Sequence, residues 1–120
     1  MPKNERKFAR FPMSGLVVIR VPGQNIQCSG TIEMIALRGV GVYTREKIPA
    51  GTLVQVEIIS FAGGGSSNYA LTGVIRNHDR YNEFGVLGVE FDNEISSADQ
   101  PKLYEYLVSQ FNKLTEYNNR

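Results

Sequence analysis

The chain of 120 residues has few of the side chains on which most small enzymes and metal proteins depend. Its one cysteine, Cys28, excludes an intramolecular disulfide, so nothing indicates an oxidising compartment. Its one histidine, His78, falls in a polar stretch that we interpret as a solvated loop. One histidine and one cysteine cannot complete the usual nitrogen and sulfur ligand set of zinc, nor place a base beside a nucleophile. We therefore expect a protein that is not an enzyme and has no metal or cofactor.

Long hydrophobic runs are also absent. The longest purely aliphatic run, over residues 16–19, has four residues, whereas a membrane-spanning helix needs about 20. Residues 1–6 have no apolar stretch after their charges, which a secretory signal would need. The sequence therefore predicts a cytoplasmic protein without a membrane span.

The net charge is small, because 13 Lys and Arg residues face 12 Asp and Glu residues. This balance hides an asymmetry, since residues 1–10 carry a local charge of +3 and the rest of the chain carries −2. An acidic body argues against an extended surface for nucleic-acid phosphates, so we expect no nucleic-acid partner. The basic arm itself is a candidate site for a smaller anion.

Strand-forming residues dominate the middle of the chain, in segments bounded by Gly, Pro or Asn. Six strands are predicted, over residues 15–21, 26–33, 39–44, 52–60, 69–76 and 84–91. Their spacing is typical of a small barrel or sandwich. Leu103, Leu107 and Phe111 then recur every fourth residue, which predicts one amphipathic helix. We expect a single domain with three segments: a basic N-terminal segment over 1–12, a β-barrel over 13–95 and a helix over 96–117.

Two arginines in the basic arm, Arg6 and Arg10, lie four residues apart with Lys7 between them. A bent segment could close both around one ligand. The planar guanidinium can donate two hydrogen bonds to O6 and N7 of guanine, and its flat face can stack on a base. Phosphate accepts the same donors. From these residues alone, a solubilising basic arm remains the alternative.

The predicted strand over residues 39–44 has one face without side chains. Val40, Val42 and Thr44 alternate onto one side, whereas Gly39 and Gly41 leave the other side bare. A ligand or another backbone segment could approach closely at this bare face.

Taken together, these features resemble a PilZ domain. The resemblance rests on the Arg-x-x-x-Arg pair before the first strand, the glycine-containing segment about 25 residues later, the closing hairpin with residues 74–76 and 85–91, and the terminal helix. It extends from Arg6 to about Leu114. The resemblance implies a mainly β fold, a six-stranded antiparallel β-barrel with a C-terminal α-helix. It also implies a bacterial receptor for the second messenger cyclic di-GMP, whose guanines and phosphates the two arginines would cover.

The second motif of the family, Asp/Asn-x-Ser-x-x-Gly, is degenerate in this chain. When its glycine is aligned with Gly39, Met34 takes the Asp/Asn position and Ala36 the Ser position. Neither side chain offers the polar groups of the motif. Strand alternation is expected to send Glu33 to the face opposite Met34. Arg38 is better placed to substitute as a phosphate or guanine contact.

The predicted ligand-binding residues come from both motifs and their surroundings: Arg6, Lys7, Arg10, Met34, Ala36, Arg38, Gly39 and Arg76. Two functions fit this set. The first is a cyclic di-GMP receptor that relays the signal to a protein partner when its arginine segment becomes ordered. The alternative is a degenerate PilZ domain that does not bind cyclic di-GMP and acts as an interaction module. The helix could cap its own barrel or pack against a second copy, so both a monomer and a homodimer stay open.

Overall fold

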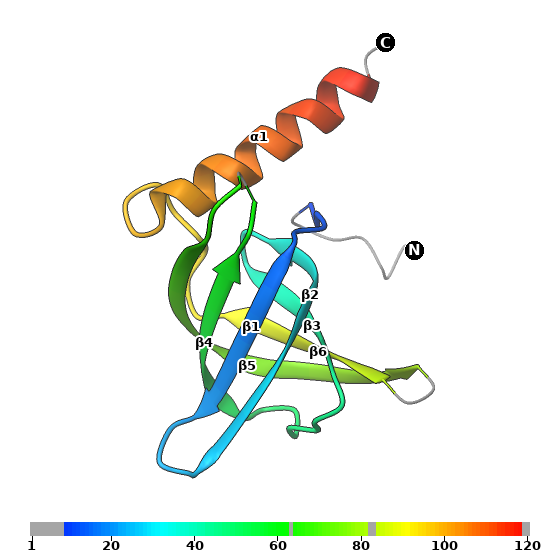
Figure 1. Cartoon of the computed structure of the whole chain (residues 1–120), viewed down its shortest axis with the longest axis vertical. Coiled ribbons are helices and arrows are strands. Elements are labelled where there is room, and N and C mark those ends of the chain that lie inside the picture. Colours follow the sequence, from blue (N-terminus) through cyan, green and yellow to red (C-terminus); the bar gives the residue numbers. More distant parts are fainter. Residues whose placement is uncertain (1–8, 63, 82–83, 119–120) are drawn as a thin grey trace.

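The computed structural model describes residues 9–62, 64–81 and 84–118. Over these residues the chain forms a closed antiparallel β-barrel of six strands with one C-terminal helix (Figure 1). The elements are β1 (Gly15–Val21), β2 (Ile26–Ala36), β3 (Gly39–Thr44), β4 (Leu53–Ser60), β5 (Ser67–Tyr81), β6 (Phe84–Phe91) and α1 (Pro101–Asn118). Around the barrel the order is β1-β2-β3-β6-β5-β4, which confirms the fold expected from the sequence.

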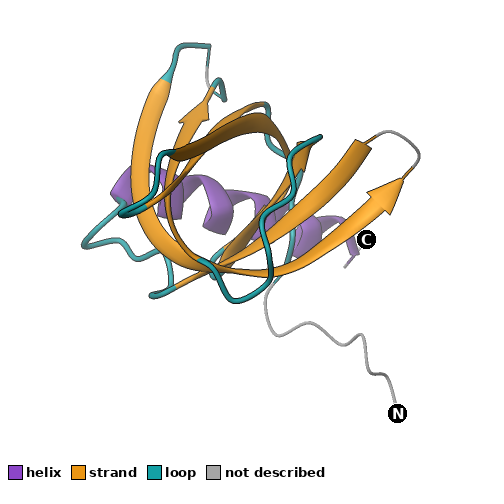
Figure 2. Cartoon of the chain, turned by 90° about the horizontal axis from the view of Figure 1, so that it is seen from below, coloured by secondary structure: helices purple, strands orange, loops and turns teal. Residues whose placement is uncertain are grey.

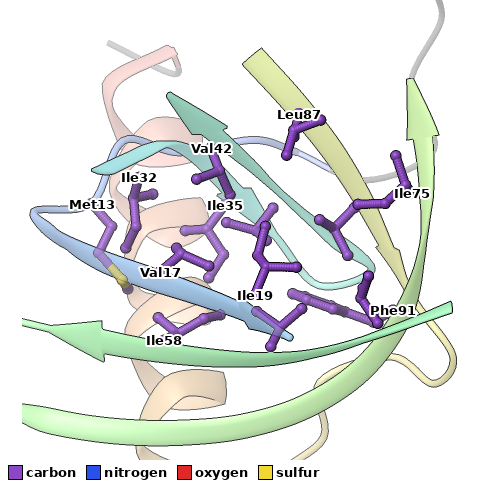
Figure 3. Packing of buried hydrophobic residues seen from close by; sticks show 14 of the residues in the cluster. Met13, Val17, Ile19, Ile32, Ile35, Val42, Ile58, Ile75, Leu87 and Phe91 are labelled. Carbon is purple, nitrogen blue, oxygen red and sulfur yellow. The ribbon is translucent and has the colours of Figure 1, made fainter. Parts of the chain in front are cut away.

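Alternating β-branched and other aliphatic residues build the barrel, because every second side chain of a strand faces the interior. Val17 and Ile19 of β1 and Ile58 of β4 are fully buried in this way. Figure 3 shows that side chains from all six strands converge on one core. Burying each such side chain stabilises the fold by about 1.5–3 kcal/mol. The alternate side chains face outwards, so polar residues and a functional site can lie on the outer surface of the barrel.

β5 extends to Tyr81, five residues beyond the end that the sequence predicted. These residues pair with β6, and the two strands extend together beyond the barrel as a long hairpin (Figure 1). The interpretation of His78 as a solvated loop residue is therefore wrong. His78 pairs with Leu87 and is half-buried, with its ring against Gly85. Strand pairing uses backbone groups, so a polar composition did not prevent it.

Two β-bulges interrupt the regular alternation of the barrel. One lies in β2 between Ile32 and Met34, and the other in β5 between Ile75 and Asn77. A bulge sets two residues of one strand against one residue of its neighbour. Consecutive side chains therefore reach the same face at each bulge. The expectation that Glu33 faces away from Met34 is wrong, because the extra residue in β2 brings both to the outer surface.

The C-terminal helix begins at Pro101, later than the expected start at residue 96. The preceding residues form a turn, in which the backbone NH of Asp99 donates to the Ser96 hydroxyl at 3.1 Å. Pro101 fits the first helical position because a helix leaves that NH unbonded. Leu103 and Leu107 are buried against the barrel. Figure 2 shows α1 crossing one end of the barrel, and its last turns extend beyond the strands in Figure 1. Among the described residues, no helix is both long and apolar enough to cross a membrane.

Candidate functional site

An open groove of about 830 Å³ crosses the outer surface of four adjacent strands, β2, β3, β6 and β5. Both β-bulges lie along it, one on each side of the β3–β6 pair. Of the eight residues predicted from the sequence, six line the groove: Arg10, Met34, Ala36, Arg38, Gly39 and Arg76. Arg6 and Lys7 lie outside the described residues. The structure thus brings the described candidates together, and their binding of a ligand stays a prediction.

Glycines form the floor of the groove. Gly41 of β3 and Gly88 of β6 are direct partners in the barrel register. The predicted bare face is occupied, since the carboxylate of Glu33 lies against Gly41 and the side-chain amide of Asn77 lies against Gly88. At Gly39, a Cβ atom would come within 2.6 Å of the backbone oxygen of Val89. A side chain at Gly39 would therefore clash with the backbone, whereas at Gly41 and Gly88 two polar groups occupy the space that a side chain would take.

Arg10 enters the groove from the end of the N-terminal segment. Its neighbour Phe11 pairs with Ile35 of β2, with the NH of Phe11 donating to the Ile35 oxygen at 2.8 Å and the NH of Ile35 donating back at 2.7 Å. Arg10 Nη2 lies 3.4 Å from Glu33 Oε1. Both side chains are largely covered, at 31% and 25% exposure. The second arginine of the Arg-x-x-x-Arg pair is thus anchored beside β2.

Arg38 lies in the turn between β2 and β3, at one end of the groove. Its Nε donates to the backbone oxygen of Phe91 at 2.8 Å, and its Nη2 donates to that of Asp92 at 3.2 Å. Two of the five guanidinium donors are therefore engaged with the end of β6. These bonds hold the guanidinium in place at this end of the groove.

Arg76 stands on the opposite wall, at the β5 bulge. It pairs with Glu90 of β6 through Nε and Oε1 at 2.5 Å, and both side chains are substantially exposed. Exposed ion pairs contribute about 0–1 kcal/mol, so this pair can open at little cost. Among the described lining residues, three arginines are matched by Glu33, Asp79 and Glu90. The described walls are therefore close to neutral, and the sequence supplies further positive charge in Arg6 and Lys7.

Sequence reasoning missed four polar residues of the groove: Glu33, Asn77, Asp79 and Glu90. Strand alternation predicts the wrong face for Glu33 because it does not reveal a bulge. The polar composition around Asn77 and Asp79 predicts a loop where the structure has a strand. One signal was available in the sequence. A glycine inside an apolar strand, such as Gly88, often marks a place where another group approaches the backbone closely.

Cys28 lies away from the groove, in the barrel core. Burial raises the pKa of its thiol above the ordinary value of 9.0, and the negative charge of Glu46 raises this pKa further, while a hydrogen bond with Thr44 opposes them. The protonated thiol therefore acts as a small apolar side chain. Within the described part of the chain, no three His, Cys, Asp or Glu side chains gather as a metal site would require.

Several solved structures share this fold. The Bacillus subtilis inhibitor of motility (MotI/DgrA) superposes with a TM-score of 0.70 at 19% identity, over 96% of this chain and 52% of that chain. Escherichia coli YcgR in complex with c-di-GMP superposes with a TM-score of 0.68 at 14% identity, over 95% of this chain and 49% of that one. This chain thus spans about half the length of either protein.

The PilZ domain of Escherichia coli YcgR with c-di-GMP matches over nearly its whole length. Its TM-score is 0.63 at 15% identity, over 96% of this chain and 98% of that chain. No sequence among the curated proteins is a significant match. At such low identities the superpositions establish the fold. The model of the PilZ domain matches residues 4–109, nearly the whole sequence, and the chain therefore belongs to the PilZ domain family.

Proposed function

We propose that this protein is a receptor for cyclic di-GMP, which binds in the groove across β2, β3, β6 and β5. The observation that carries the proposal is the convergence of Arg10, Arg38 and Arg76 around a floor of glycines. Arginine suits both chemical parts of the ligand, because it can pair with guanine edges, stack on the bases and bind phosphates. The side chains of Glu33 and Asn77, which rest on this floor, add further hydrogen-bonding groups.

The energetics require an arm that is partly organised before the ligand arrives. Two bidentate arginine–guanine contacts supply about 2–6 kcal/mol, whereas ordering six residues costs roughly 6–12 kcal/mol. Micromolar affinity needs about 8 kcal/mol net. In the free protein, Arg10 is already held by the pairing of Phe11 with Ile35 and by Glu33. Because this part of the ordering precedes binding, fewer residues remain to be ordered by the ligand.

In the same proposal, the basic arm also relays the signal. In this proposal residues 1–12 are the switch segment, residues 13–95 are the barrel that holds the ligand, and residues 96–117 are the helical segment, although α1 itself ends at Asn118. A ligand that binds the closed arm more tightly than the open arm shifts the population towards the closed form. The closed arm then offers a new surface that a protein partner recognises.

A second candidate function is supported by Met34 and Ala36. Both line the groove in place of the polar residues of the family motif. A PilZ domain that has lost its ligand would act as an interaction module. Such a protein would capture its partner equally well with and without cyclic di-GMP, whereas a receptor would capture it only in one of these states.

Isothermal titration of the full chain with cyclic di-GMP at low salt tests the receptor proposal. The expected result is saturable binding, weakened about tenfold to hundredfold in Arg10→Ala because a bidentate contact is lost. Arg20→Ala is the matched control, since Arg20 pairs with Glu57 on the outer surface of the barrel away from the groove. Absence of binding to the wild type at high micromolar ligand would contradict the proposal. Equal affinity of Arg10→Ala and the wild type would remove Arg10 from it.

A further inference from the structure

Two polar side chains reach onto the groove floor from opposite walls. Glu33 comes from the β2 bulge and Asn77 from the β5 bulge. Their polar ends lie against Gly41 and Gly88, and these glycines are partners in the barrel register. The carboxylate and the amide therefore occupy neighbouring positions at the centre of the floor. This arrangement depends on both bulges and on both glycines.

The pair is chemically complementary to the Watson–Crick edge of guanine. That edge presents two adjacent donors, N1–H and the N2 amino group, beside one acceptor, O6. An ionised carboxylate only accepts hydrogen bonds and can take both donors at once, and an amide NH₂ can donate to O6. Adenine has an unprotonated N1 at the same place. This nitrogen and the carboxylate both only accept hydrogen bonds, so they would repel each other.

We propose that Glu33 and Asn77 read the guanine base, in place of the polar side chains that Met34 and Ala36 lack. This inference rests on the proposed function, because it names the residues that select the base of cyclic di-GMP in the same groove. The β2 bulge provides the substitution, since it moves a carboxylate from the adjoining sequence position onto the face where the motif would have placed one.

The ion pair with Arg10 is compatible with this role. Among the described residues, the hydrogen bond that Glu33 accepts is from Arg10 to Oε1, at 3.4 Å. A carboxylate has about four lone-pair sites, so Oε2 and the second site on Oε1 remain for a base. Arg10 also offsets the negative charge that Glu33 would otherwise present to the ligand phosphates. Glu33 thus positions Arg10 and contacts the base in the same bound state.

The test combines a change in the protein with a change in the ligand. Cyclic di-GMP and cyclic di-IMP differ only in the N2 amino group, which hypoxanthine lacks. By isothermal titration, the wild type is expected to bind cyclic di-GMP about tenfold more tightly than cyclic di-IMP, because one hydrogen bond to a charged group is lost. Glu33→Gln is expected to bind cyclic di-GMP about tenfold to hundredfold more weakly and to discriminate the two ligands less than about threefold. Asn77→Ala is expected to weaken both ligands by about the same factor, since both keep O6.

Glu57→Gln is the matched control, because Glu57 also pairs with an arginine on the outer barrel surface but lies outside the groove. Its affinities should equal those of the wild type. The inference is overturned, with the receptor function intact, if Glu33→Gln binds cyclic di-GMP as tightly as the wild type or more tightly. It is also overturned if the wild type does not distinguish the two ligands. A wild type that binds neither dinucleotide overturns both the inference and the proposed function.

Discussion

Glu33 shows how one residue can change the chemistry of the groove. The family motif would place its polar side chains at positions 34 and 36, where this chain has Met34 and Ala36. The carboxylate of Glu33 nevertheless reaches the floor, one position earlier in the sequence, and also holds Arg10. The groove therefore lacks the polar side chains of the motif at positions 34 and 36 but retains a carboxylate at its centre.

The glycines of β3 provide a prediction at the same scale. A Cβ atom on Gly39 would meet the backbone oxygen of Val89 at 2.6 Å, and this oxygen cannot move without disturbing the barrel. A Cβ atom on Gly41 would meet the flexible side chain of Glu33, which can swing away. Gly39→Ala is therefore expected to lower the free energy of unfolding by about 1–3 kcal/mol, and Gly41→Ala by less.

Urea unfolding of the two variants, with the wild type as reference, gives this comparison directly. Gly41→Ala should also weaken cyclic di-GMP binding, because Glu33 can no longer rest on the floor. If Gly41→Ala is the more destabilising of the two, the Glu33 side chain beside Gly41 does not move as easily as we infer, or the backbone beside Gly39 moves more easily.

Among the elements, the strands show what sequence patterns can and cannot predict. The bounds of β1, β3 and β6 coincide with their predicted ranges, and none of these three strands contains the extra residue of a bulge. β2 and β5 both run longer than predicted, and each contains a bulge. A bulge depends on the register with a neighbouring strand, which is a tertiary property that no local pattern encodes.

The residues of the candidate site could likewise be predicted only in part from the sequence. The arginines and the glycine of the motifs were found because their residue types and spacings are distinctive. Glu33 and Asn77 were missed because their positions on the groove floor arise from the two bulges. The residues that shape the centre of the groove are thus those that depend most on the pairing of the strands.

The helix supports a prediction that separates its two halves. Leu107 is 2% exposed against the barrel, whereas Leu114 is 47% exposed farther along α1. Leu107→Ala is expected to lower the free energy of unfolding by about 2–5 kcal/mol, the cost of a cavity in a core. Leu114→Ala should change it by less than about 0.5 kcal/mol. Thermal or urea unfolding measures both, and similar costs for the two variants would show that α1 is not docked through Leu107.

At the scale of the whole molecule, charge is divided between the arm and the body. The N-terminal ten residues carry +3 and the remainder −2, while the described walls of the groove balance three arginines with three acids. In the receptor proposed above, the barrel supplies shape and hydrogen-bonding groups, and the basic arm supplies the net positive charge that a dianionic ligand needs.

We propose that the folded chain binds cyclic di-GMP, and thermal unfolding of the full chain tests this claim most directly. A ligand that binds only the folded state stabilises it by about 2.7 kcal/mol at one hundred times its dissociation constant. For a domain of this size, that corresponds to a rise of roughly 8–16 °C in Tm. We predict such a rise with cyclic di-GMP, a smaller rise in Arg10→Ala and none with guanosine monophosphate at the same concentration. An unchanged Tm of the wild type in saturating cyclic di-GMP would contradict the claim.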